Sequence, residues 1–253
     1  MKLKLALISL VSLAALGCVS GPSPKEQRQA EIQYDLGVDH LRSGRPREAL
    51  REFLASEKIN PEFPELQNAL GLTYYLLGNS AAALQHFEKA LQLKPDYSEV
   101  FNNMARVYIA QGRFRPAIEL LEKALQDVFL RERYLAESNL GWALFQVGEK
   151  ERAYQLVKNA LAQNQRYCVG YQYLGLMQQF DKDLEKAAQS LGKALEFCPE
   201  FTEAKRDLGK VLLMQGDVNG GCRLLKECQQ TGPMTQLGQE CERLWKASCQ
   251  ANP

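Results

Sequence analysis

Residues 67–95 read QNALGLTYYLLGNSAAALQHFEKALQLKP, and this stretch decides the fold. Small residues stand where two helices would have to come close, with Gly71 on the first helix and Ala83 on the second. Gly78 separates the two helices, and Pro95 ends the second one. The stretch therefore predicts an antiparallel helical hairpin with a close helix–helix contact.

The same pattern recurs along the chain at an offset of 34 residues. Gly37 precedes Gly71 by this interval, and Phe53 precedes Phe87. The offset continues into a third unit and then, after two extra residues, into three more. A helix-turn-helix of this length resembles the tetratricopeptide repeat (TPR). The resemblance implies an all-α, right-handed superhelical TPR solenoid with six repeats over residues 30–235.

The turn inside each unit carries a further signal. Glycine, which ends a helix readily in the left-handed conformation, stands there in five of the six units, at Gly44, Gly78, Gly112, Gly148 and Gly216. The fifth unit has Asp181-Lys182-Asp183 instead. We therefore expect an irregular turn in that unit.

Residues 236–253 predict a C-terminal capping helix. Leu237, Cys241, Leu244 and Trp245 recur at spacings that place them on one helical face. A solenoid needs such an element, because its last repeat would otherwise expose an apolar surface.

The N-terminus has the features of a bacterial lipoprotein signal peptide, over residues 1–18. Two lysines precede an apolar run that is too short to span a bilayer comfortably. The ending Ala15-Leu16-Gly17-Cys18 resembles a lipobox, which implies that acyl chains on Cys18 anchor the protein stably. An ordinary secretory signal with a chance cysteine is the alternative. Residues 19–29 then form a tether, and the absence of Asp after Cys18 implies sorting to the outer membrane, facing the periplasm.

Six cysteines remain after Cys18, all in the C-terminal third of the chain. An even number in an exported protein favours disulfides, and no CxxC or nearby His supports a metal site. Cys168 and Cys198 lie at ends of one hairpin that should meet, so this is the pairing we expect first. Cys222 would lie level with Cys249, and Cys228 with Cys241, but Cys222 and Cys228 do not share a helix face. For these four we expect a cross-linked cap with the pairing open.

Composition and motifs point away from catalysis and from nucleic acid. The net charge is +1 with a pI of about 7.5, so no strongly basic face is implied. The chain has no glycine-rich phosphate loop, HExxH motif or nucleophile elbow. The two histidines do not suggest a site either: we expect His40 to pack and His86 to be exposed. We predict a protein without enzymatic activity, cofactor or metal.

In TPR arrays the first helix of each unit lines the concave face. Mapping that face onto the chain gives an aromatic and apolar middle with a few amide and guanidinium groups. Such a groove suits an apolar or amphipathic segment of a partner protein. The predicted groove residues are Asn68, Leu72, Tyr75, Asn102, Arg106, Trp142, Phe145, Leu176 and Phe180.

A lipobox, a short tether and six TPR units together resemble the type IV pilus biogenesis/stability lipoproteins, the pilotins of the pilus secretin. Within that group, the cysteine-rich end and the unit count look most like the social-gliding pilotin of myxobacteria. The resemblance implies binding of the secretin and promotion of its outer-membrane localisation and oligomerisation, as pilus assembly and motility require. We expect Leu72, Tyr75, Trp142 and Phe145 to contact it. The alternative is an outer-membrane TPR lipoprotein that recruits peptidoglycan synthases or hydrolases.

Overall fold

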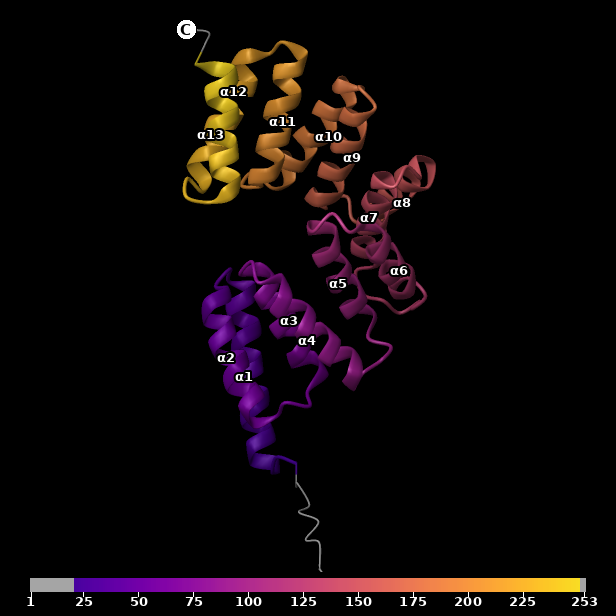
Figure 1. Cartoon of the computed structure of the whole chain (residues 1–253), viewed down its shortest axis with the longest axis vertical. Coiled ribbons are helices and arrows are strands. Elements are labelled where there is room, and N and C mark those ends of the chain that lie inside the picture. The colour runs from indigo at the N-terminus through magenta and orange to yellow at the C-terminus, as the bar shows by residue number, and fades with distance from the viewer. Residues whose placement is uncertain (1–20, 251–253) are drawn as a thin grey trace, which may run out of the picture.

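The computed structural model describes residues 21–250 as thirteen α-helices, with no strand in that range (Figure 1). Twelve helices form six antiparallel pairs, and the thirteenth closes the C-terminal end. The helices are α1 (Pro24–Arg42), α2 (Pro46–Ile59), α3 (Pro64–Leu76), α4 (Ser80–Leu93), α5 (Ser98–Ala110), α6 (Phe114–Ala124), α7 (Arg133–Gln146), α8 (Lys150–Gln163), α9 (Cys168–Phe180), α10 (Leu184–Phe197), α11 (Thr202–Gln215), α12 (Val218–Thr231) and α13 (Gln236–Cys249).

Each pair is held together by a small residue facing a large one. A Cβ placed on Gly71 would lie 2.5 Å from the ring of Phe87, so α3 and α4 can approach this closely only with glycine at that position. Phe87 and Ala83 are fully buried in the contact. Gly37 and Phe53 repeat the arrangement between α1 and α2.

The pairs stack into an arc, because each first helix contacts the second helix before it and the first helix before that. Leu66 and Leu70 on α3 are fully buried by this stacking. Their equivalents at the start of the array, Ile32 and Leu36 on α1, are 53% and 44% exposed. Burial at these positions therefore comes from the neighbouring repeat.

The turn of the fifth unit corrects our expectation of irregularity. Lys182 adopts φ +64°, which matches the left-handed conformation of Gly78 at φ +80°. The Lys182 N–H donates to the Gln179 carbonyl, as the Gly78 N–H donates to that of Tyr75. The turn is therefore regular, although a non-glycine residue occupies its left-handed position.

The third repeat departs from the others at its end. Helix α6 stops at Ala124, and residues 125–132 form a loop that takes up the two extra residues of the sequence. Val128 and Phe129 at its tip are 79% and 87% exposed, while Leu130 folds back into the core.

At the N-terminus, helix α1 begins at Pro24, six residues before the predicted first repeat. Ser23 caps it: its hydroxyl accepts the Glu26 N–H, and the Glu26 carboxylate accepts the Ser23 N–H at 2.8 Å. The predicted tether over residues 19–29 is thus helical from Pro24 onward. Cys18 and the predicted signal peptide lie outside the described residues.

The C-terminal cap consists of α13 packed antiparallel to α12. Two disulfides join these helices, Cys222–Cys249 and Cys228–Cys241, and a third, Cys168–Cys198, joins the ends of the α9–α10 hairpin. The buried Cys228–Cys241 bridge lies inside the α12–α13 contact, whereas Cys222 and Cys249 are partly exposed. A helix contact is wide enough for both bridges, which is why cysteines on different faces of α12 can both reach α13.

Candidate functional site: the concave groove

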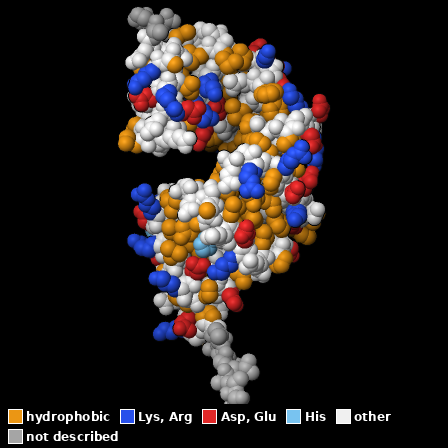
Figure 2. Space-filling model, viewed as in Figure 1, with side chains coloured by type: hydrophobic (Ala, Val, Ile, Leu, Met, Phe, Trp, Pro, Cys, Tyr) orange, Lys and Arg blue, Asp and Glu red, His pale blue; other side chains and the backbone are white. Residues whose placement is uncertain are grey.

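Within residues 21–250, the first helices of neighbouring pairs contact one another and the second helices do not, so the first helices line the inside of the arc. A notch opens between the N-terminal and C-terminal halves of the molecule (Figure 2). The repeat brings one side chain from each unit to the same height along this surface. One such row contains Leu72 on α3, Arg106 on α5, Trp142 on α7 and Leu176 on α9. All four are partly exposed, as residues of a binding surface must be.

A cavity of about 450 Å³ lies in the middle of the groove, between α3, α5, α7 and α9. Its walls are mainly aromatic and aliphatic, with one guanidinium and one carboxamide. The lining residues are Tyr75, Arg106, Ile109, Ala110, Leu135, Asn139, Tyr167, Val169 and Tyr173.

The aromatic groups of the cavity are held in place by contacts with one another. The ring of Tyr173 stacks on Trp142, with centroids 5.1 Å apart and planes 6° from parallel. The Arg106 guanidinium lies over the ring of Tyr75, 5.3 Å from its centroid. Burial raises the pKa of Tyr167 to about 12 and that of Tyr173 further still, so both phenols are neutral at physiological pH.

Polar pairs along the groove fix the spacing of successive first helices. The Asn103 amide donates to Asn68 Oδ1 at 3.0 Å, and the Asn139 amide donates to Asn102 Oδ1 at 2.9 Å. Each bond joins neighbouring repeats, because the partners are 35 and 37 residues apart. These bonds satisfy buried polar groups and hold the groove in one register.

The structure places most of the predicted groove residues on the concave surface, but not all. Asn68, Leu72, Arg106, Trp142 and Leu176 are partly exposed on the first helices, and Tyr75 lines the cavity itself.

Two of the predicted groove residues are buried, and a third is exposed but does not line the cavity. Asn102 is only 8% exposed because it bonds to Asn139 between helices. Phe145 is 5% exposed, with its ring packed edge-on against Tyr154 of α8 and Phe180. Phe180 itself is 68% exposed but lies at the end of α9, outside the residues that line the cavity. Asn102 and Phe145 therefore stabilise the scaffold and offer little surface to a partner.

Seven lining residues are absent from the predicted groove set: Ile109, Ala110, Leu135, Asn139, Tyr167, Val169 and Tyr173. Four of them hold two repeat positions, near the start and middle of the first helix, in units four and five. The repeat itself could have indicated those four. Tyr167 precedes α9 and comes from the connection between repeats, which the mapping left out.

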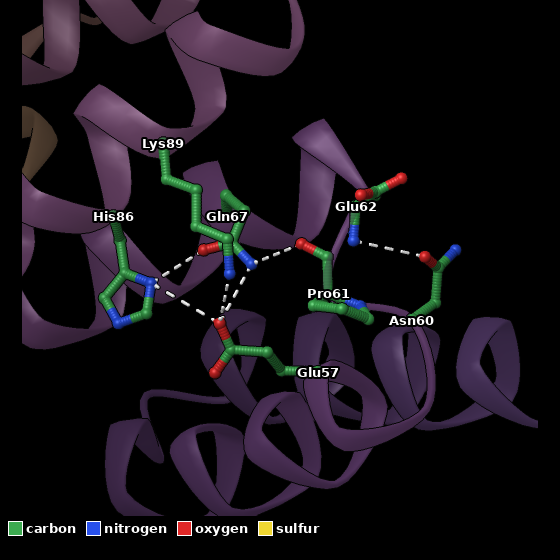
Figure 3. A network of polar contacts seen from close by, with 7 residues as sticks. All are labelled: Glu57, Asn60, Pro61, Glu62, Gln67, His86 and Lys89. Carbon is green, nitrogen blue, oxygen red and sulfur yellow. Dashed lines mark hydrogen bonds and ion pairs between the residues drawn. The ribbon is translucent and has the colours of Figure 1, made fainter. Parts of the chain in front are cut away.

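His86 was predicted to be exposed and is instead half-buried in a polar network that joins the first two repeats (Figure 3). Its Nδ1 donates to Gln67 Oε1 at 2.8 Å, and its ring stacks on Tyr74. Glu57 accepts hydrogen bonds from Gln67 Nε2 at 2.9 Å and from Lys89 Nζ at 3.0 Å. Burial holds the pKa of His86 below its usual value, so the imidazole is neutral at pH 7. The network is a structural link between α2, α3 and α4.

Residues 21–250 contain neither a cluster of metal-ligating side chains nor a membrane-spanning helix. This part of the chain gathers no three His, Cys, Asp or Glu side chains in a geometry that could hold a metal ion. None of the helices it forms is both long enough and apolar enough to cross a bilayer.

Comparison with known proteins identifies the class of the repeat. Sequence profiles of the tetratricopeptide repeat match residues 30–54, 64–127 and 102–167. With the stacked helical pairs described above, these matches confirm the predicted fold: the chain is a right-handed TPR solenoid protein. No curated protein matches the chain by sequence.

Solved structures with this fold include PilW and PilF. PilW, a widely conserved type IV pilus biogenesis factor, is 20% identical with a TM-score of 0.66, over 83% of this chain and 97% of PilW. PilF of Pseudomonas aeruginosa is 17% identical with a TM-score of 0.63, over 87% of this chain and 99% of PilF. Part of the APC/C hetero-tetramer Cut9–Hcn1 is 18% identical with a TM-score of 0.75, over 89% of this chain but 44% of the other. At such identities these similarities establish the fold alone.

Proposed function

We propose that this protein is a pilotin: an outer-membrane lipoprotein, anchored through Cys18, that binds the type IV pilus secretin and promotes its localisation and oligomerisation. The observation that carries the proposal is the aromatic cavity in the concave groove. It is large enough for one or two side chains of a partner, and it is built on a rigid solenoid.

Length also supports the proposal. This chain covers nearly the whole of PilW and PilF, whereas it covers less than half of the Cut9–Hcn1 chain. A similar number of stacked repeats gives a groove of similar extent. PilW and PilF are therefore similar to this chain over their full length and not only over a segment, which supports a comparable role.

The mechanism we propose is binding without turnover. Acyl chains on Cys18 would confine the groove to the plane of the membrane, and confinement raises the effective concentration of captured secretin subunits relative to one another. Ring assembly would follow from that concentration and would need no cofactor or covalent chemistry in the pilotin.

Deletion of the gene tests this function. Heat-stable secretin multimers in outer-membrane fractions should disappear, and plasmid-borne wild-type protein should restore them. If the multimers persist while cell-wall growth changes, the protein is instead a scaffold for peptidoglycan enzymes. Replacing Cys18 with Ala in the same strain tests the anchor, since secretin multimers should then fall even though the groove is intact.

A further inference from the structure

We propose that the cavity selects a partner segment in which an Asp or Glu side chain lies beside a large apolar residue, and that Arg106 receives the carboxylate. This inference rests on the proposed role of the groove and names the chemistry of what the groove binds.

Arg106 is a cation without a carboxylate partner in the described part of the chain, where the ion pairs involve other basic side chains. The first helix of the sixth unit shows the contrast. Arg206 on α11 is paired with Asp207 at 2.8 Å and with Glu240 at 3.1 Å. Its charge is neutralised within the fold, and that of Arg106 is not.

The position of Arg106 is also unusual within its own row. The equivalent residues on the neighbouring first helices are Leu72, Trp142 and Leu176, and a second cation, Lys210, follows only on α11. Arg106 therefore places one positive charge in the middle of an apolar strip. The apolar residues on both sides continue the groove past the cavity, so the bound carboxylate belongs to an internal Asp or Glu and not to a chain terminus.

The surroundings of the guanidinium favour an anionic acceptor. The ring of Tyr75 lies 5.3 Å from Arg106 Cζ and positions the guanidinium at the cavity wall. Tyr75 and Tyr173 line the same cavity, and their hydroxyls make no hydrogen bond within residues 21–250, so they are available to a ligand bound there. A carboxylate matches the paired N–H groups of arginine in bidentate geometry and accepts from phenols as well.

The apolar side chains of the cavity determine which kind of partner residue should lie beside the bound carboxylate. Ile109, Leu135 and Val169 contribute aliphatic surface, and Tyr173 is fixed against Trp142. A phenyl, indole or leucine side chain would bury apolar area against these groups while the acid reaches Arg106. An amphipathic segment with an acidic and an aromatic or leucine side chain close together meets both requirements.

Selection from a display library of random linear peptides on the immobilised full chain tests this inference without assuming the partner. We expect the recovered peptides to contain Asp or Glu next to, or one residue from, an aromatic residue or Leu. Synthetic copies should bind Arg106→Glu roughly tenfold to a hundredfold more weakly than wild type. Copies with Lys in place of the acid should bind Arg106→Glu better than they bind wild type. Arg115→Glu, the same charge reversal on the exposed side of α6, should bind like wild type.

Recovered peptides without an acidic preference, equal affinity for wild type and Arg106→Glu, or no recovered peptides would each overturn the inference. Circular dichroism checks the fold, and Arg106→Gln provides the same comparison if the Glu variant is misfolded. Secretin binding measured on the same proteins separates the two proposals. Selected acidic peptides with no secretin binding would reject the function and retain this specificity. Secretin bound equally by wild type and Arg106→Glu would retain the function and reject the specificity.

Discussion

Among single residues, the glycines that face large side chains make the sharpest test of the packing. Gly71→Ala would place a methyl group 2.5 Å from the Phe87 ring, and we expect it to lower the free energy of unfolding by about 1–3 kcal/mol. Gly192→Ala on α10 is the matched control, since a Cβ there meets nothing within 4 Å. Removing glycine from that open helical site should stabilise the protein by up to about 1 kcal/mol. Urea unfolding of both variants measures this, and equal destabilisation would contradict the packing account.

The polar network of Figure 3 makes a prediction about pH. Burial opposes ionisation of Glu57, but hydrogen bonds from Gln67 and Lys89 outweigh it and hold the pKa of Glu57 below its ordinary 4.5. The folded chain therefore binds this proton less readily than the unfolded chain does. The resulting stabilisation is complete above pH 4.5 and is lost as the pH falls through the lower folded pKa.

Glu57→Gln should therefore cost roughly 0.5–1 kcal/mol at pH 7, a figure reduced for solvent screening because Glu57 is partly exposed. The difference from wild type should vanish toward pH 3 in unfolding experiments across the acidic range. Glu88→Gln, at an exposed position of α4, serves as the control. If the difference between wild type and Glu57→Gln is constant with pH, the substitution destabilises the protein through altered packing and not through loss of the negative charge.

Among the elements, the capping helix is the one that depends most on covalent links. In a solenoid each repeat contacts only its neighbours, so an end helix can unfold alone. Cys222→Ala with Cys249→Ala removes a link between residues 27 apart, which constrains the unfolded end by about 3–4 kcal/mol in the chain-entropy account. Amide exchange in α13 should accelerate strongly, while exchange in α3 and α4 stays unchanged. Uniform acceleration through the molecule would mean that the array unfolds as one unit.

The helices and their order could be predicted from the 34-residue offset, because the offset reflects one contact repeated along the chain. The conformation of the turn in the fifth unit could not be predicted in this way. Glycine elsewhere indicated a left-handed residue, but Lys182 adopts the same conformation without that signal. The start of α1 was also placed too late, because Gly21-Pro22 suggested a tether while Ser23 and Glu26 formed a capping box.

At the scale of the whole molecule, the concave face was predictable but its accessible residues were only partly so. Repeat position indicates which face of a helix points inward, so Tyr75 and Arg106 were found. Repeat position does not indicate how deeply a side chain on that face is buried. Phe145 lies on the same face yet is buried by Tyr154 and Phe180, which come from other elements. Tyr167 lines the cavity from a connection, where the repeat gives no guidance.

The central claim is that the concave groove binds the pilus secretin. Site-specific photo-crosslinking in living cells tests it most directly, with a benzophenone amino acid in place of Tyr75 in the cavity or of Arg115 on the exposed side of α6. We predict a crosslinked product containing the secretin from position 75 and none from position 115. Crosslinks to the secretin from neither position, or from position 115 alone, would contradict the account.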